Sequence, residues 1–361
     1  MKGCIQMVNT DNDRDVSEGI GQLECRNSGH DGQSAHPLLF TDISSIKALN
    51  AAWRKFSRGK KSRQDVSSYQ QDLQPNISNL HELLVSGYYR HQPYQKFMIH
   101  DPKQRSIHKA TVQDRVVHQS IVTATEPLFE RRFIFDSYSC RAGKGTHAGV
   151  KRLYTFLRKV SNNDTRKVYI LKCDIKKYFA SIDHHILLGL IEHQVCDERT
   201  LELIRTILSS HGQESGCGIP LGNVTSQLFA NIYLHELDWY VKQTLGVKYY
   251  ARYCDDFVIV SDDKLYLRNI VGKIRQFLWE KLHLELHPYK ITIRSWNQGI
   301  DFLGFVLRPH AVTIRNKTHK RILDRVSATN LSSYVGICSH ADAYHISQIL
   351  YMAAWRRGAG V

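Results

Sequence analysis

Two adjacent carboxylates, Asp255 and Asp256, lie between two short apolar runs and constrain the fold of this chain more than any other feature. Residues 247–252 read Val-Lys-Tyr-Tyr-Ala-Arg, and residues 257–260 read Phe-Val-Ile-Val. Aromatic and β-branched residues on both sides of a tight polar step predict a β-hairpin with the carboxylates at its turn. Neighbouring carboxylates repel each other, and hard cations such as Mg²⁺ cancel that repulsion. A solvated turn is the alternative, because a Tyr-x-Asp-Asp match occurs by chance in about three per hundred chains of this length.

A third carboxylate, Asp174, ends the apolar run of residues 168–173. An acid at the end of a buried strand sits on a rigid support at the edge of a sheet. If that strand pairs beside the hairpin, three carboxylates meet, and they can hold two Mg²⁺ ions about 4 Å apart for in-line nucleotidyl transfer. A helix N-cap is the alternative for Asp174, and it is the role that we predict for Asp183.

Helical and strand patterns alternate irregularly along the rest of the chain. Apolar spacing predicts helices over 43–56, 80–86, 223–240 and 264–282, and Thr111 opens another that Pro127 should kink or interrupt. Residues 94–108 read as a hairpin, and 284–286, 291–293 and 302–307 read as short strands. Without strict strand–helix alternation, the pattern favours an α+β fold with an antiparallel sheet and helices packed on one face.

The charge of the chain is strongly positive and unevenly spread. The net charge is +15, but residues 1–38 carry three basic and six acidic side chains, so residues 39–361 carry +18. Such a field attracts polyanions, although a basic surface without a ligand is the alternative. Residues 1–38 are polar and without periodicity, which predicts a disordered tail. No apolar stretch approaches the roughly 20 residues that span a bilayer, so we expect no membrane contact.

Several motifs, taken together, resemble a known family. Five of them occur in the order of the palm motifs of reverse transcriptases: 174–179, 222–227, 253–256, 286–290 and 302–305. Upstream, residues 103–105, 114–117, 133–141 and 143–147 resemble the fingers of bacterial, group II intron-like enzymes. The resemblance implies a right-hand polymerase fold. Its parts would be N-terminal helices and fingers over 39–165, a palm over 166–309 and a short helical thumb over 310–361.

The resemblance also implies a role for each motif. Asp174, Asp255 and Asp256 would bind two Mg²⁺ ions, for which Mn²⁺ is a substitute, and act as catalytic residues with Lys290, which would protonate pyrophosphate. Substrate contacts would come from the following residues: Lys103 and Arg105 on the triphosphate, Phe179 as the steric gate against ribose, Gly222 and Gln227 at the templating base pair, and Tyr253 beneath the primer end. The hairpin that grips the primer terminus would be formed by Phe302, Leu303, Gly304 and Phe305. Core packing remains the alternative for Phe179, Phe302 and Phe305, and a surface position the alternative for Lys290.

One motif departs from the intron-type pattern and narrows the function. Intron-type enzymes carry Gln-Gly-x-x-x-Ser-Pro, whereas residues 221–227 read Leu-Gly-Asn-Val-Thr-Ser-Gln. This variant is similar to that of diversity-generating retroelement reverse transcriptases, which copy RNA with frequent errors at adenines. The resemblance implies a cytoplasmic, bacterial or phage-encoded enzyme that binds dNTPs, template RNA and nascent cDNA. A structured non-coding RNA and a small basic accessory protein would be its partners.

The sequence is also compatible with three other functions. An antiphage defence reverse transcriptase shares this palm and length, and it could be protein-primed or template-independent. An intron-like remnant is the second alternative. A catalytically idle RNA-binding protein is the third, although the three clustered acids argue against it.

Overall fold

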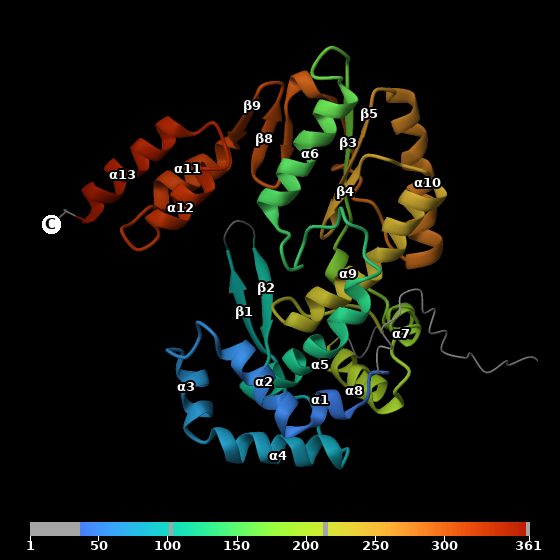
Figure 1. Cartoon of the computed structure of the whole chain (residues 1–361), viewed down its shortest axis with the longest axis vertical. Coiled ribbons are helices and arrows are strands. Elements are labelled where there is room, and N and C mark those ends of the chain that lie inside the picture. The colour runs from blue at the N-terminus through green and yellow to red at the C-terminus, as the bar shows by residue number, and fades with distance from the viewer. Residues whose placement is uncertain (1–36, 101–103, 212–215, 359–361) are drawn as a thin grey trace, which may run out of the picture. The chain divides into compact units, whose positions relative to one another are not determined.

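The described part of the chain begins with a group of helices, followed by a two-stranded hairpin (Figure 1). The computed structural model describes residues 37–100, 104–211 and 216–358. The predicted disordered tail therefore lies almost wholly outside the described residues. The elements are α1 (Thr41–Ser44), α2 (Ile46–Ser57), α3 (Gln64–Gln71), α4 (Leu73–Val85), β1 (Gln95–Ile99) and β2 (Arg105–Lys109). Strands β1 and β2 pair antiparallel, as the sequence predicted for this hairpin.

Helix α5 (Val112–Glu130) contributes many buried residues to the larger hydrophobic cluster and packs against α1, α2, α3 and α9. Its N-cap is the predicted Thr111, whose hydroxyl accepts a hydrogen bond from the backbone N–H of Asp114 at 3.2 Å. The predicted interruption at Pro127 is wrong, because the helix continues to Glu130. Proline removes a single backbone donor, and here it does so in the last turn of the helix. The chain then forms α6 (Thr146–Val160).

A four-stranded antiparallel sheet carries the acidic motifs, with strand order β4-β5-β3-β6. Its strands are β3 (Tyr169–Asp174), β4 (Tyr250–Tyr253), β5 (Asp256–Ser261) and β6 (Thr292–Ser295). Between β3 and β4 the chain forms the short helix η1 (Tyr178–Ala180), α7 (His184–Glu192), α8 (Glu198–Ser209), α9 (Val224–Trp239) and the π-helical turn η2 (Tyr240–Thr244). Asp183 is the N-cap of α7, as predicted.

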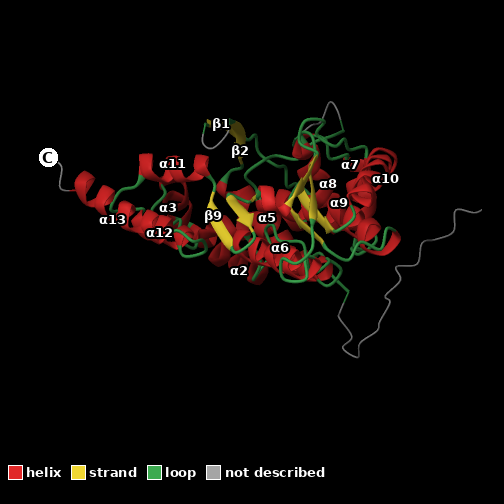
Figure 2. Ribbon diagram, turned by 90° about the horizontal axis from the view of Figure 1, so that it is seen from above, coloured by secondary structure: helices red, strands yellow, loops and turns green. Residues whose placement is uncertain are grey.

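The two faces of this sheet belong to different hydrophobic clusters, because alternate residues of a strand point to opposite faces. Leu171, Cys173 and Phe257 join the larger cluster, which includes α9 and α10 (Lys264–Leu282). Ile170, Val258 and Val260 join the smaller cluster, which includes α6. In Figure 1, α6 and α10 accordingly lie on opposite sides of β3 and β5. Figure 2 shows the strands in yellow between the helices.

A second sheet of three antiparallel strands follows the short helix η3 (Trp296–Gln298) and leads into the C-terminal helices. Its strands are β7 (Ile300–Phe302), β8 (Phe305–Arg308) and β9 (Ala311–Ile314), followed by α11 (Asn316–Arg325), α12 (Leu331–Cys338) and α13 (Tyr344–Gly358). The single strand that the apolar pattern predicted over 302–307 is wrong, because the chain turns there, in agreement with the hairpin that the resemblance implied for 302–305. Leu303 and Gly304 have φ values of 50° and 93°, which is the conformation of a tight two-residue hairpin turn.

Two further sequence expectations concern isolated segments. The strand predicted over 284–286 is reduced to one bridge between Leu286 and Ile175. None of the helices in the described ranges has both the length and the apolar character needed to cross a membrane.

Candidate active site

The pairing of β3 with β5 places Asp174 directly opposite Asp256. Opposed residues on antiparallel strands have Cβ atoms about 4.5–5.5 Å apart. Tyr253 pairs with Asp256 and closes the β4–β5 hairpin, which leaves Cys254 and Asp255 as its two-residue turn. The backbone N–H of Ile175 donates to the carbonyl of Asp255 at 3.3 Å. The structure thus brings the three predicted carboxylate residues to one end of the sheet.

The carboxylates at this end are electrostatically crowded. Burial raises the pKa of Asp255, and the negative charge of Asp174 raises it further. Burial also raises the pKa of Asp256, where the ammonium of Lys172 opposes the effect and the charges of Asp174 and Asp255 add to it. Crowding of this kind favours protonation or the arrival of a cation, because either removes the repulsion.

Two lysine ammonium groups already lie against the carboxylates. Lys290 Nζ is 2.6 Å from Asp174 Oδ1, and Lys172 Nζ is 3.7 Å from Asp256 Oδ2. Lys172 also donates to the backbone carbonyl of Asp301 at 3.1 Å. Lys290 therefore lies on the carboxylate cluster. Lys172 was not singled out from the sequence, although its place two residues before Asp174 on a strand puts both on one face.

The donor chemistry of this cluster suits a hard divalent cation. Asp174, Asp255 and Asp256 offer carboxylate oxygens, which are the ligands that Mg²⁺ prefers. Within the described ranges, no three His, Cys, Asp or Glu side chains are gathered closely enough to count as a metal-binding group. In this structure the Asp174 carboxylate is paired with the ammonium of Lys290. The three acids are the residues that would hold the ion.

The other substrate-contact candidates lie on separate elements. Phe179 is half-buried in η1, with its ring 5.4 Å from that of Tyr178 and packed against the larger core. Arg105 is exposed at the start of β2, paired with Ile99. Lys103 lies outside the described residues.

The loop before α9 is hydrogen-bonded to the β1–β2 hairpin. The N–H of His108 donates to the carbonyl of Leu221 at 3.0 Å, and Asn223 Nδ2 donates to the carbonyl of His108 at 3.0 Å. Gly222 has a φ of +111°, and a Cβ there would lie 2.8 Å from Ile107 Cγ2. Glycine is therefore required by the close approach of β2. Gln227 is exposed on the first turns of α9.

The candidate primer-grip residues divide into two pairs. Phe302 and Phe305 are 0% and 2% exposed, so both rings belong to the core. Leu303 and Gly304 form the turn between them and remain partly exposed. Of these four residues, Leu303 and Gly304 are the ones accessible to a bound strand. Tyr253 is half-buried against the smaller cluster at the end of β4.

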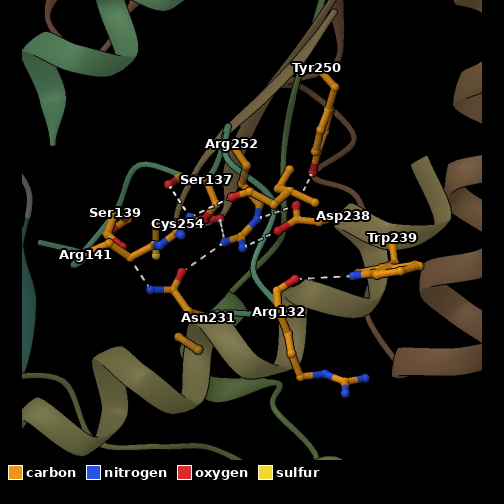
Figure 3. A network of polar contacts seen from close by, with 12 residues as sticks. Arg132, Ser137, Ser139, Arg141, Asn231, Asp238, Trp239, Tyr250, Arg252 and Cys254 are labelled. Carbon is orange, nitrogen blue, oxygen red and sulfur yellow. Dashed lines mark hydrogen bonds and ion pairs between the residues drawn. The ribbon is translucent and has the colours of Figure 1, made fainter. Parts of the chain in front are cut away.

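A fully buried ion pair beneath the acidic turn was missed by the sequence reasoning. Arg252 donates from Nη2 to Asp238 Oδ2 at 2.6 Å and from Nε to Asp238 Oδ1 at 2.7 Å, and Tyr250 donates to Asp238 at 2.7 Å. Arg252 Nη1 also donates to the carbonyl of Cys254 at 3.1 Å (Figure 3). The sequence did contain a signal for this pair. Arg252 lies inside a predicted strand and Asp238 inside an apolar helix, and a buried charge is strongly destabilising unless an opposite charge pairs with it.

Comparison with known proteins decides the family. The sequence model described as reverse transcriptase (RNA-dependent DNA polymerase) matches residues 99–307, more than half of the chain. The chain belongs to the reverse transcriptase family. This membership gives the enzyme class, RNA-directed DNA polymerase, and it agrees with the predicted right-hand polymerase fold. The matched segment includes β2 to β7 and most of β8, and thus all three carboxylates of the cluster.

Similar proteins come from bacteria and from yeast. This reverse transcriptase is 26% identical over 272 residues to protein YkfC of Escherichia coli K12, covering 64% of this chain and 71% of that protein. It is 25% identical over 322 residues to the group II intron-encoded protein LtrA of Lactococcus lactis subsp. cremoris, covering 69% of this chain. The chain spans 53% of the length of LtrA, about half. Among solved structures, apo telomerase from Candida tropicalis truncated from its C-terminal domain aligns with a TM-score of 0.48 at 12% identity, covering 66% of this chain and 59% of that one.

Proposed function

We propose that this reverse transcriptase copies an RNA template into DNA at the end of the sheet where Asp174 faces Asp256. The observation that supports this most strongly is the β3–β5 register, which brings both carboxylates beside the turn that carries Asp255. Carboxylates on two paired strands are held on rigid backbone, as a polymerase needs for positioning its reactants. The positive charge of residues 39–361 suits a polyanionic template.

The proposed reaction is a phosphoryl transfer. The 3′-oxygen of the primer forms a bond to the α-phosphorus of the dNTP, the bond from that phosphorus to the bridging oxygen breaks, and pyrophosphate leaves with the electron pair. When bound, two Mg²⁺ ions would acidify the 3′-hydroxyl and neutralise the triphosphate. The hydroxyl proton passes to solvent, and the Lys290 ammonium supplies a proton to the leaving group. Positioning and charge neutralisation account for most of the rate.

The surrounding residues would select the substrates. Phe179 would stand against the sugar and exclude a 2′-hydroxyl, and Lys103 and Arg105 would contact the triphosphate from the hairpin. Gly222 and Gln227 would lie at the templating base pair. The hydrogen bonds between 221–223 and His108 support this arrangement, since they join the hairpin to the template-side loop. We propose the same division into fingers, palm and thumb that the motifs predicted.

The finer biological role that we propose is error-prone copying of the diversity-generating kind. It rests on the sequence of residues 221–227, and the exposed position of Gln227 on α9 supports it. A side chain that reaches solvent from this helix is available to contact a templating base. Glutamine in place of the proline of intron-type enzymes would lower the discrimination against mismatched base pairs. A structured non-coding RNA and a small basic accessory protein would then be partners.

Extension of a primed RNA with dNTPs and Mg²⁺, followed by sequencing of every product, tests both the polymerase activity and the error-prone role. cDNA complementary to the template supports reverse transcription, and errors concentrated opposite template adenines support diversification. Accurate cDNA would favour an intron-like role. DNA unrelated to the template, or DNA attached to the protein, would favour a defence role. Absence of DNA, also with the candidate non-coding RNA and accessory protein added, would contradict the proposal.

A further inference from the structure

A chain of hydrogen-bonded side chains runs from the segment before β1 to the first turn of α9. His91 Nε2 lies 3.1 Å from His118 Nε2, and His118 Nδ1 lies 3.0 Å from the hydroxyl oxygen of Thr225. His118 belongs to α5 and is 0% exposed. Thr225 is also buried, and it belongs to the segment 221–227 that leads into α9. The chain of contacts therefore joins three parts of the protein that are far apart in the sequence.

The partners at the two ends determine which nitrogen of each imidazole carries a hydrogen. The carbonyl oxygen of Gln92 can only accept, so His91 Nδ1, which lies 2.7 Å from it, is the donor. The other nitrogen of a neutral imidazole accepts, so His91 Nε2 accepts from the Nε2–H of His118. His118 Nδ1 is then an acceptor, and the Thr225 hydroxyl donates to it. Each group in the chain thus donates in the same direction, from Thr225 towards Gln92.

Burial keeps both imidazoles neutral at pH 7, as this arrangement requires. Burial, assisted by the positive charges of His91 and Arg115, lowers the pKa of His118 to about 3. Burial also lowers the pKa of His91, although the carboxylate of Asp114 opposes the effect. A protonated imidazole donates from both nitrogens and cannot accept from a neighbour. The low pKa values therefore preserve the order of donors and acceptors.

The segment that receives this chain contains three buried polar side chains: Asn223, Thr225 and Ser226. Asn223 and Ser226 donate to backbone carbonyl groups. Thr225 is the one of the three that bonds to a side chain of another element, that of His118. A substitution on α5 can therefore remove this contact without changing the sequence of segment 221–227.

We propose that His118, together with His91, is a positioning residue that holds Thr225 and thereby fixes segment 221–227 for the selection of each new base pair. The inference rests on the proposed function, which puts this segment at the templating base pair. Discrimination between base pairs of different shape needs groups that are held in place, so a loosened segment accepts mismatches more readily. His118 is fully buried and cannot contact a substrate, so it acts through Thr225.

Hydrogen exchange of the full-length protein, without nucleic acid or metal, tests whether the chain anchors the segment. Thr225→Val and His118→Leu each remove the bond between the two side chains. In both variants we expect amide hydrogens of peptides covering 220–228 to exchange about tenfold faster than in the wild type. Thr225→Ser keeps the hydroxyl and should exchange as the wild type does. Thr125→Val is the matched control, because Thr125 is also buried and donates to the carbonyl of Ile121 within α5 at 2.8 Å.

Single-nucleotide extension of a primed RNA tests whether the anchor affects base-pair selection. The measured quantity is the ratio of kcat/KM for the correct dNTP to that for a mismatched one. It is measured opposite a template guanine, so that the proposed errors at adenines do not interfere. We expect the ratio to fall about tenfold in Thr225→Val and in His118→Leu, and to stay at the wild-type value in Thr225→Ser and Thr125→Val. The double variant should show no larger fall than either single one, because both substitutions remove the same bond.

Several results would overturn the inference. Unchanged exchange over 220–228 in Thr225→Val would show that the chain does not anchor the segment. Faster exchange with an unchanged ratio would show that the anchor has no effect on selection, and additive falls in the double variant would show that the two residues act separately. A thermal unfolding curve checks that each variant folds, and Thr225→Val, the smaller change, decides the question if His118→Leu does not.

The exchange measurement needs no polymerase activity, so its failure is distinct from failure of the proposed function. A wild-type protein that makes no cDNA would refute the proposed function and with it the role in selection, whatever the exchange result. Templated cDNA synthesis with unchanged exchange in Thr225→Val would refute only the positioning role of His118.

Discussion

Arg252 and Asp238 form a two-point ion pair in which both side chains are completely buried. The same guanidinium donates to the carbonyl of Cys254, a residue held at a φ of 56° in the turn before Asp255. These hydrogen bonds join α9 to β4, the strand that leads into the carboxylate turn. Neither side chain reaches solvent, so the pair cannot contact a substrate. Its role is to position the turn that carries Asp255.

Removal of one partner of this pair should strongly destabilise the fold. Arg252→Met leaves Asp238 buried without its cation, and we expect the free energy of unfolding to fall by about 3–5 kcal/mol. Urea denaturation followed by circular dichroism measures the change. The double variant Arg252→Met with Asp238→Leu should recover much of the loss, because no charge is then left unpaired. Equal stability of the single variant and the wild type would contradict this account.

Lys290 should affect the chemical step more than substrate binding. Its ammonium lies 2.6 Å from Asp174, where a proton for the leaving group is needed. For Lys290→Met we expect the single-turnover rate of dNTP addition to fall about 100-fold, with a smaller change in dNTP affinity. Lys273→Met, an exposed position on α10, is the control. A rate for Lys290→Met within twofold of the wild type would rule out the acid role.

Phe179 should control the choice of sugar. Its half-buried ring follows Asp174 by five residues and lies beside Tyr178. Phe179→Ala should raise the efficiency of rNTP incorporation relative to dNTP by about 10- to 100-fold, because the steric barrier to the 2′-hydroxyl is gone. Competing single-nucleotide extensions measure the ratio. Unchanged sugar selectivity with lowered stability would make Phe179 a core residue only.

Asp65 should make stability depend on pH below the neutral range. Burial alone would raise its pKa, but hydrogen bonds from Lys109 and Arg115 lower it to about 2. A depressed folded-state pKa stabilises the fold above the unfolded value near 4, and this contribution is lost as the pH falls towards 2. Asp65→Asn should therefore lower the unfolding temperature at pH 7 but have little effect near pH 2. An equal effect at both pH values would contradict the assignment.

The sequence predicted local features of the site well because they follow from strand periodicity and turn chemistry. The hairpin around Asp255, the strand that ends at Asp174 and the N-cap Asp183 all depend on neighbours within a few residues. Their convergence required only one assumption, that β3 pairs beside the hairpin, and the register confirms it.

Contacts between segments that lie far apart in the sequence could not be predicted from local sequence patterns. The pairing of Arg252 with Asp238 depends on how α9 packs on β4. The run 302–307 is uniformly apolar apart from Gly304, so the apolar pattern predicted one strand, and only the family resemblance of 302–305 indicated a hairpin. The burial of Phe302 and Phe305 likewise depends on the second sheet.

Extension of a primed RNA by the wild-type protein and by Asp256→Asn, with RNA binding measured in parallel, tests the central claim most directly. We predict that the wild type makes templated cDNA and that Asp256→Asn slows synthesis by about 10³-fold or more while RNA affinity stays within a few-fold. Asp262→Asn, an exposed acid after β5, should behave as the wild type. Templated synthesis by Asp256→Asn at the wild-type rate would contradict the assignment of the carboxylate cluster as the polymerase centre.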